Sequence, residues 1–259
     1  MSVAAGMTVV AALALALALP AAATAQPVRL IADLSDSRID IATTFAGAEL
    51  LVFGAVQYPR GRLPATPPDL AVILRGPAGP VTVRRKSRVA GVWVNAAAER
   101  FETAPGFYAL ATSRPVASML DERGAAIYEI GLAHLQLSPS GGGDAAASQA
   151  FIAGLVDVRR RRGLYSEQPR GVRLTEGVLY RARLPIPSQV PVGDYRVEIH
   201  LIADNRVLAS ATRPIPIARS GFERWVYVVA HQRPVAYGLA AVALALASGL
   251  AAGAAMRRD

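Results

Sequence analysis

The sequence predicts a mainly β fold with a helical insert: two immunoglobulin-like β-sandwich modules outside the cytoplasm, followed by one C-terminal transmembrane helix. Runs rich in β-branched and aromatic residues, separated by Pro- and Gly-rich turns, fill 28–112 and recur over 171–218. Residues 115–162 between them show helical spacing instead. Residues 235–256 contain no charged side chain and are long enough to cross a bilayer.

Length, charge and cysteine content limit what the chain can be. Its 259 residues allow one or two domains. The formal net charge is +9, and Lys86 is the only Lys, so nearly every cation is an Arg. No platform of interleaved aromatic and basic residues accompanies this charge, which argues against nucleic acid and favours anionic lipid headgroups as its partner. Because the chain has no Cys, disulfides and thiolate chemistry are excluded.

The N-terminus has the pattern of a secretory signal peptide. An apolar run over 8–19 is too short to span a bilayer comfortably, and Ala23-Thr24-Ala25 gives the small-x-small pattern that signal peptidase accepts. We expect a signal peptide over 1–25, with cleavage before Gln26. Residues 1–7 carry no Lys or Arg, so an uncleaved N-terminal anchor remains an alternative.

Residues 26–114 form the first expected β-sandwich. Proline- and glycine-rich turns at 64–68 and 76–80 separate several of its strands. Trp93 lies in a Val-rich run and is therefore expected in the core, although Trp93 and Asn95 are also candidates for a specific contact. The predicted strands cover 38–41, 49–56, 70–74, 81–85, 89–94 and 107–111.

A helical connector is expected over 115–168. Apolar residues recur with helical spacing over 115–137, and a second helix over 144–162 has Asp144 as its cap and Gly163 at its end. The arginines at 159–162 complement the dipole of this helix, which is a sufficient reason for their presence.

A second, smaller β-sandwich over 169–220 is expected close to the membrane. Its predicted strands are 178–184, 195–203, 207–212 and an edge strand at 215–218, with Asp204-Asn205 as a tight turn. An interfacial segment over 221–234 leads into the predicted transmembrane helix.

The predicted span over 235–256 sets the orientation. Arg257 and Arg258 follow it in the tail 257–259, and the positive-inside rule places this tail in the cytoplasm. We therefore expect a single-pass protein of the inner (plasma) membrane with its bulk in the periplasm. Ala245, Gly249 and Gly253 share one helix face, where a second membrane helix can approach closely, although an Ala- and Gly-rich helix also produces this spacing by chance.

Motifs that carry chemistry are lacking in the sequence. We expect no catalytic residues, no cofactor and no metal site, because His134, His200 and His231 share no ligand spacing and no nucleophile-elbow or phosphate-loop motif follows a strand. His200 lies in a strand pattern and is expected to face outward. The acidic residues at 33–40 fit a turn between strands better than an acid–base pair.

The densest basic cluster is Arg84, Arg85, Lys86 and Arg88. Its pattern is typical of a strand–turn–strand tip that faces water. The alternative is a binding surface for an oxyanion or for an acidic partner.

Nine short stretches recur in a fixed order along nearly the whole mature chain. They are Ala32-Asp33-Leu34-Ser35, Phe45-Ala46-Gly47, Phe53-Gly54-Ala55, Val92-Trp93-Val94-Asn95, Pro105-Gly106-Phe107-Tyr108, Ser113-Arg114-Pro115, Gly163-Leu164-Tyr165, Gly193-Asp194-Tyr195 and Tyr237-Gly238. In these stretches the chain resembles a family of alphaproteobacterial transmembrane proteins. The resemblance implies a signal-bearing, single-span protein that is often encoded beside a sulfite-exporter-like permease, and it offers no catalytic residues to transfer.

Three functions are compatible with these observations. The favoured one is a non-enzymatic accessory subunit of a polytopic membrane permease that exports sulfite or other sulfur oxyanions. The alternative is a membrane-tethered periplasmic module that binds envelope components such as peptidoglycan or another extracytoplasmic protein. The third, an enzyme, requires a pocket near Trp93, Asn95 or the acidic turn.

Overall fold

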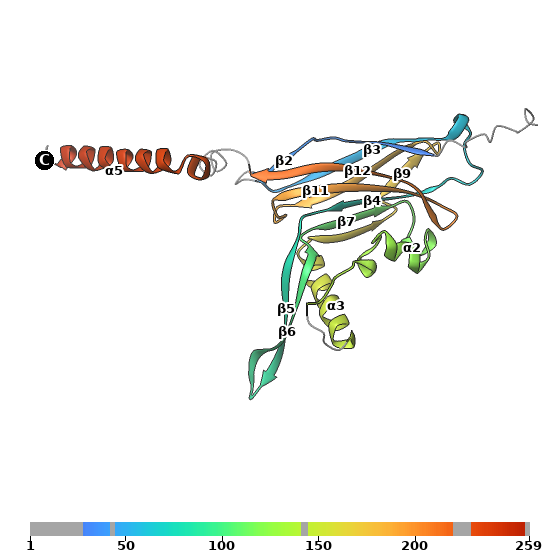
Figure 1. Ribbon diagram of the computed structural model, residues 1–259, viewed down its shortest axis with the longest axis horizontal. Helices are drawn as coiled ribbons and strands as arrows, with labels where there is room; N and C mark the ends of the chain where they lie inside the picture. Colours follow the sequence, from blue (N-terminus) through green and yellow to red (C-terminus); the bar gives the residue numbers. More distant parts are fainter. Residues whose placement is uncertain (1–27, 42–44, 141–144, 220–228, 257–259) are drawn as a thin grey trace, which may run out of the picture.

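The computed structural model describes residues 28–41, 45–140, 145–219 and 229–256, and its largest part is a β-sandwich (Figure 1). One sheet has four strands in the order β1-β3-β10-β9, and the other has six in the order β2-β12-β11-β4-β7-β8. The smaller sheet contains β1 (Arg29–Leu34), β3 (Gly47–Gln57), β9 (Val172–Thr175) and β10 (Leu179–Pro187). The larger contains β2 (Ile39–Ile41), β4 (Asp69–Arg75), β7 (Tyr108–Thr112), β8 (Tyr165–Pro169), β11 (Gly193–Ala203) and β12 (Arg206–Arg219).

Both sheets combine strands from the two halves of the chain, so the prediction of two separate sandwich modules over 26–114 and 169–220 is wrong. β3 pairs antiparallel with β10, with Leu50 opposite Leu184, and β4 pairs antiparallel with β11, with Val72 opposite Ile199. Local alternation reveals that a segment is a strand, but it does not identify the partner strand. The two halves therefore share one core.

The burial pattern explains why each strand takes its place. β10 alternates strictly, with Tyr180, Ala182 and Leu184 buried while Arg181 and Arg183 face solvent. In β4, by contrast, six consecutive residues are buried. A strand that is apolar on both sides needs cover on both sides. The four-stranded sheet covers one face of the larger sheet, and the segment after β7 covers the other.

That covering segment is less regular than the single helical pattern expected over 115–137. It consists of two short 3-10 helices, η2 (Val116–Ser118) and η3 (Leu132–His134), on either side of one short α-helix, α2 (Glu122–Ile127). Asp121 caps α2 by accepting a hydrogen bond from Gly124 N. The chain turns at Gly131, whose φ of +111° ends any continuous helix. Four of its apolar side chains are nevertheless buried, namely Met119, Leu120, Ile130 and Leu135.

The second expected helix is confirmed as α3 (Ala145–Arg161). Gly163 follows it with a φ of +69°, and its N–H donates to Arg160 O at 2.9 Å. Phe151 and Leu155 are the buried side chains of its apolar face. The predicted cap, Asp144, lies outside the described residues.

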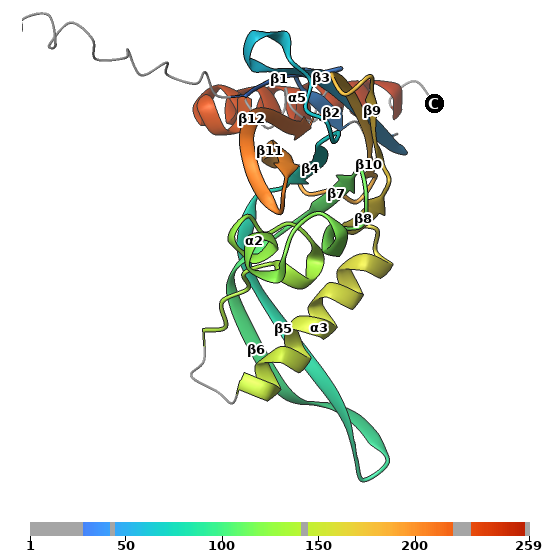
Figure 2. The ribbon, with the colours of Figure 1, turned by 90° about the vertical axis from the view of Figure 1, so that its right-hand side faces the viewer.

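A long two-stranded ribbon, β5 (Ala78–Val89) and β6 (Val92–Pro105), projects from the sandwich beside α3 (Figure 2). Its turn lies at Ala90 and Gly91, both with positive φ, so the strand predicted over 89–94 is interrupted by a hairpin turn. Trp93 lies just after this turn and is 66% exposed, which corrects the prediction that it is a core residue. Nothing else in the described chain covers this end of the ribbon.

The C-terminal helix α5 (Pro234–Met256) extends away from the sandwich (Figure 1). Across the part of the chain that was described, no helix meets the length and hydropathy of a membrane span. The span over 235–256 therefore stays a prediction. The signal peptide, most of the interfacial segment and the tail at 257–259 lie outside the described residues.

Gly54 is a position where the fold has no room for a side chain. A Cβ there would lie 2.0 Å from Ile31 O and 2.6 Å from the hydroxyl of Tyr180, which itself donates to Ile31 O at 2.9 Å. We predict that Gly54→Ala lowers the free energy of unfolding by about 2 kcal/mol or more, because it forces β1, β3 and β10 apart. Urea unfolding of the detergent-solubilised chain measures the loss.

The matched control is Gly79→Ala. Gly79 lies in β5, and a Cβ there would meet no atom within 4 Å. Equal stability losses in the two variants would show that the contact at Gly54 is not the cause.

Candidate functional site

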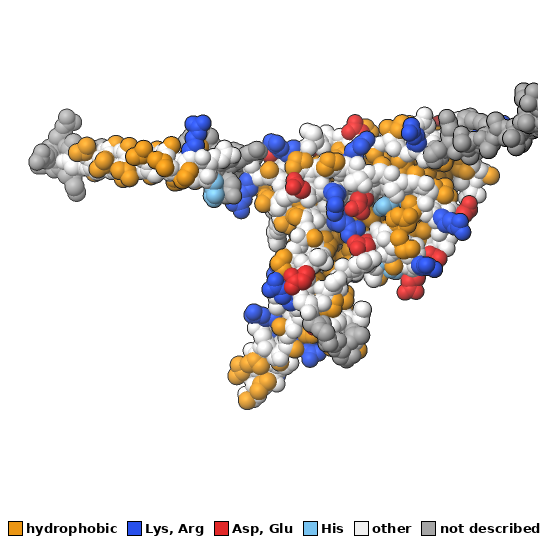
Figure 3. All heavy atoms as spheres, in the orientation of Figure 1, with side chains coloured by type: hydrophobic (Ala, Val, Ile, Leu, Met, Phe, Trp, Pro, Cys, Tyr) orange, Lys and Arg blue, Asp and Glu red, His pale blue; other side chains and the backbone are white. Residues whose placement is uncertain are grey.

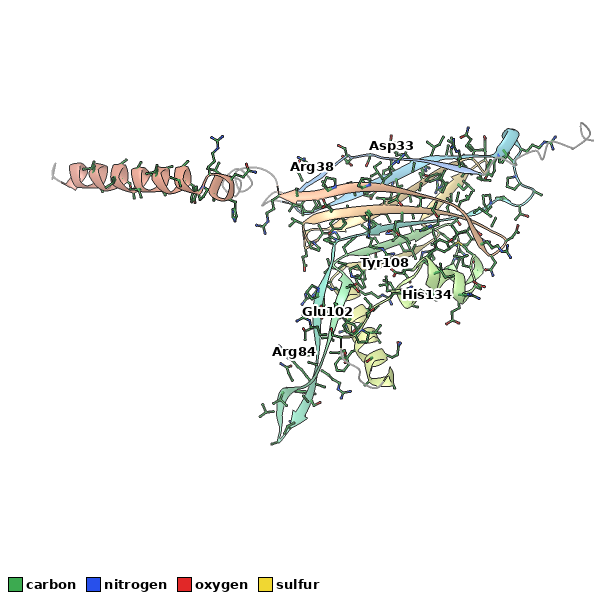
Figure 4. The ribbon with its side chains drawn as sticks, viewed as in Figure 1. Asp33, Arg38, Arg84, Glu102, Tyr108 and His134 are labelled. Carbon is green, nitrogen blue, oxygen red and sulfur yellow. The ribbon has the colours of Figure 1, made fainter. Side chains whose placement is uncertain are left out.

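The predicted basic cluster lies on the distal half of β5, where Figure 4 labels Arg84. All four side chains are exposed. The Arg85 guanidinium lies 5.8 Å from the ring centroid of Phe151 on α3, and Arg88 Nε donates to Gly91 O at 3.1 Å. Residues 81–98 contain no Asp or Glu, so the positive charge of this part of the ribbon is not neutralised within the ribbon itself.

The strand register places the basic cluster next to Trp93 and Asn95, two residues that the sequence analysis treated separately. Trp93 is paired with Arg88, and Asn95 with Lys86. Directly paired residues share one face of a ribbon. The pairs Val89–Val92 and Ser87–Val94 alternate with these and form the other face. We call residues 86–96 the ribbon tip.

The predicted small-residue face lies on α5. Ala245, Gly249 and Gly253 are all exposed, and a Cβ added at either glycine would meet no atom within 4 Å. Among the residues that the structure describes, this face has no packing partner in the chain.

A groove lies at the end of the sandwich where β4 begins, and the sequence analysis did not predict it. Two adjoining cavities of about 810 Å³ and about 700 Å³ lie beneath the Pro-rich loop before β4. Both are lined by Asp69 and Arg114. The only sequence signal was the Ser113-Arg114-Pro115 stretch of the resemblance, which gave no indication of its partner 44 residues away.

The carboxylate of Asp69 is fully engaged at the wall of this groove. Asp69 Oδ1 accepts from Ser113 Oγ at 2.7 Å and from Arg114 Nε at 2.9 Å, and Asp69 also forms an ion pair with Arg114 Nη2. Burial alone would raise the pKa of Asp69, but the hydrogen bonds from Arg114 and Ser113 outweigh it and hold that pKa below its usual value. Arg114 itself keeps an exposed guanidinium at the groove.

The other end of β4 carries a second ion cluster. Arg75 pairs with Glu129 and lies 3.6 Å from Glu198 through Nη2, with its guanidinium 5.7 Å from the ring centroid of Tyr108. Tyr108 donates its hydroxyl hydrogen to Glu129 O at 2.8 Å. These contacts attach the segment after β7 to the larger sheet, so their role is structural.

His200 lies beside this cluster and corrects another prediction. It is on the outer face of the larger sheet, as expected, but Tyr128 covers it with a ring separation of 5.4 Å, and the side chain is buried. His200 Nδ1 is 2.8 Å from Ser210 Oγ. Burial, reinforced by the charge of Arg75, lowers the pKa of His200 from 6.5 to about 4, so the ring is neutral at pH 7.

In the part of the chain that the structure describes, no group of three or more His, Cys, Asp or Glu side chains is placed to bind a metal ion. The ion clusters at the two ends of β4 bind their own partners. Open surfaces among the described residues include the ribbon tip, the small-residue face of α5 and the groove. A further cavity of about 550 Å³ lies between the segment after β7 and β8, where Leu110, His134 and Glu167 contribute to its lining.

Comparison with known proteins identifies one family. Residues 29–258 match the sequence profile of the family described as "Putative transmembrane protein (Alph_Pro_TM)". No curated protein matches the chain.

The lowered pKa of His200 predicts a pH-dependent stability. The unfolded chain binds a proton at His200 below about pH 6.5, whereas the folded chain resists it until about pH 4. This contribution to stability is therefore complete above pH 6.5 and is lost as the pH falls toward 4, by about 3 kcal/mol in total. His200→Gln should reduce the difference in unfolding free energy between pH 7 and pH 4.5.

His134→Gln is the control, because His134 is only partly buried. If both variants keep the full pH dependence of the unmodified chain, His200 is not its source.

Proposed function

The chain belongs to this family of transmembrane proteins, and from that membership we propose that it is a single-span, non-enzymatic accessory subunit of a membrane permease. Its sandwich acts in the periplasm, α5 crosses the inner membrane, and the C-terminus lies in the cytoplasm. The lipid bilayer and a polytopic permease are its partners.

The observation that carries the proposal is the surface of α5. The sequence supplies the length: the 22 residues 235–256 would be about 33 Å long as a helix, against about 30 Å for the hydrocarbon core of a bilayer. The large apolar side chains of α5 point away from any core, with Leu244 75% and Leu250 76% exposed. Residues 235–256 contain no charge, while Arg257 and Arg258 follow directly. Lipid is the solvent in which such a surface is stable.

The small-residue face of α5 supports a contact with a second helix. Within a bilayer, helices associate through close packing rather than through the hydrophobic effect, so faces without bulky side chains are the favoured contacts. Ala245, Gly249 and Gly253 supply such a face, while Leu244 on the opposite side of the helix is available to face lipid. The resemblance noted above implies a sulfite-exporter-like permease as neighbour, which makes sulfur-oxyanion export the process served.

The absence of enzymatic activity is part of this proposal. Asp69 is the buried acid of the groove, and Ser113 and Arg114 already occupy it. Arg75 is likewise engaged by Glu129 and Glu198. A general acid or base must reach a substrate proton, and these groups are held by protein partners instead.

The second candidate is a membrane-tethered module that binds envelope components. The groove favours it, because its lining residues come from the start of β4 and from the turn between β11 and β12. In Figure 1 this turn lies at the end of the sandwich away from the C-terminal end of β12. An open groove on that side faces the envelope rather than the membrane.

Cross-linking in the native membrane tests the first candidate. We predict that affinity capture and mass spectrometry recover a permease with the full chain, and that Gly249→Leu/Gly253→Leu reduces the yield tenfold or more by filling the close contact. A span in which 235–256 is replaced by poly-Leu should behave likewise.

Ala247→Leu is the matched control, since Ala247 lies on the opposite side of α5 and its substitution should leave capture intact. Capture of envelope material alone, unchanged by every span variant, would contradict the permease assignment and support the tethered module. Unchanged permease abundance and transport after loss of the chain would also contradict it.

A further inference from the structure

We propose that the ribbon tip is a second membrane contact, which inserts Trp93 and its neighbouring valines among the headgroups of an anionic lipid bilayer. This inference rests on the proposed function in one respect: α5 keeps the sandwich next to the membrane. The contact itself is carried by a different element and a different set of residues.

The tip exposes apolar side chains that the fold does not use. Val92 is 64% and Trp93 66% exposed, and Val89 and Val94 are exposed as well. They occupy both faces of the hairpin and gather at its end, as Figure 3 shows. Trp is the side chain that most favours the boundary between water and hydrocarbon, because its ring is apolar and its N–H is polar.

The positive charge of the ribbon matches a lipid headgroup layer. Arg84, Arg85 and Lys86 lie farther from the turn than Trp93, Arg88 is paired with Trp93, and no Asp or Glu occurs within 81–98. An apolar end followed by a cationic collar meets the bilayer in the right order, with hydrocarbon first and phosphate behind it. Every cation near an anionic surface adds to the attraction. A protein partner would need an acidic rim around an apolar pocket of matching shape.

The base of the ribbon is built as a rigid arm. Phe101 of β6 is fully buried, and Val81 and Val83 of β5 pack against the core. α3 lies along the ribbon, with Phe151 buried and within cation–π distance of Arg85. The packing ends before the tip, where residues 88–96 are exposed without exception. The base of the ribbon is therefore packed against the rest of the protein, whereas its tip is exposed.

The arm reaches the side of the molecule that faces the membrane. In Figure 1 the tip extends as far to the left as the end of β12, where Arg219 is the last described residue before the chain continues to α5. A plane at that end of the sandwich therefore meets both the start of the tether and the ribbon tip. The two contacts are laterally separated, so together they restrict the tilt of the sandwich over the membrane.

Tryptophan fluorescence of the full chain in vesicles tests the contact. The chain has two Trp, so Trp225→Phe leaves Trp93 as the only reporter. In vesicles of phosphatidylglycerol and phosphatidylethanolamine we expect blue-shifted Trp93 emission, quenched at least twofold by lipids that carry a quencher just below the headgroup. Neutralising the collar, as Arg84→Gln/Arg85→Gln/Lys86→Gln/Arg88→Gln, should remove more than half of this quenching.

A matched reporter on the far end of the sandwich is Leu208→Trp in a Trp93→Phe/Trp225→Phe chain. Leu208 is 50% exposed and lines the groove, so its emission should not respond to the lipid quencher. Quenching of Trp93 no stronger than that of this control overturns the proposal. So does full quenching by the neutralised chain, or a blue shift that requires a second protein and ignores the lipid quencher.

Flotation with the vesicles separates this proposal from the one before it. A chain that floats while Trp93 remains unquenched retains its α5 span and lacks the ribbon contact. A chain that neither floats nor shows Trp93 quenching lacks both.

Discussion

The fold depends on one strand, β4, whose interior is wholly apolar and whose two ends are charged. Leu70 to Leu74 are fully buried, between the four-stranded sheet on one side and the segment after β7 on the other. Asp69 and Arg75 at the ends are each neutralised by groups from that segment or from β11. A slip of one residue would pull one charge into the core and leave the other without its partner. The paired charges at both ends therefore disfavour a shift in the register of β4.

Local sequence patterns were sufficient to find most of the strands, because alternation and β-branched runs reflect the burial of single elements. They could not reveal that β3 pairs with β10 or β4 with β11, since each partner lies more than a hundred residues away. The same limit hid the groove, which requires Asp69 and Arg114 to meet. The basic cluster and the small-residue face could be recognised in the sequence, because each lies within one continuous element; their roles as contact surfaces stay predictions.

The errors over Trp93 and His200 have a common origin. A pattern of apolar residues predicts burial only when another element is available to cover them, and none of the elements that the structure describes covers the ribbon tip. His200 shows the reverse case, in which Tyr128 from a distant loop covers an outer face that the strand pattern leaves polar.

Several stretches that carry the family resemblance hold the fold together. Their tyrosines donate to backbone carbonyls: Tyr108 to Glu129 O, Tyr165 to Pro105 O and Tyr195 to Pro191 O.

The interleaving of the two halves has a consequence for biogenesis. Neither sheet can close until β10, β11 and β12 have been synthesised, so the N-terminal strands leave the ribosome with open edges and no partners. Pairing of segments this far apart is slow. The first strands must therefore remain unpaired while most of the chain is being made, and exposed edges of this kind are prone to aggregate until their partners arrive.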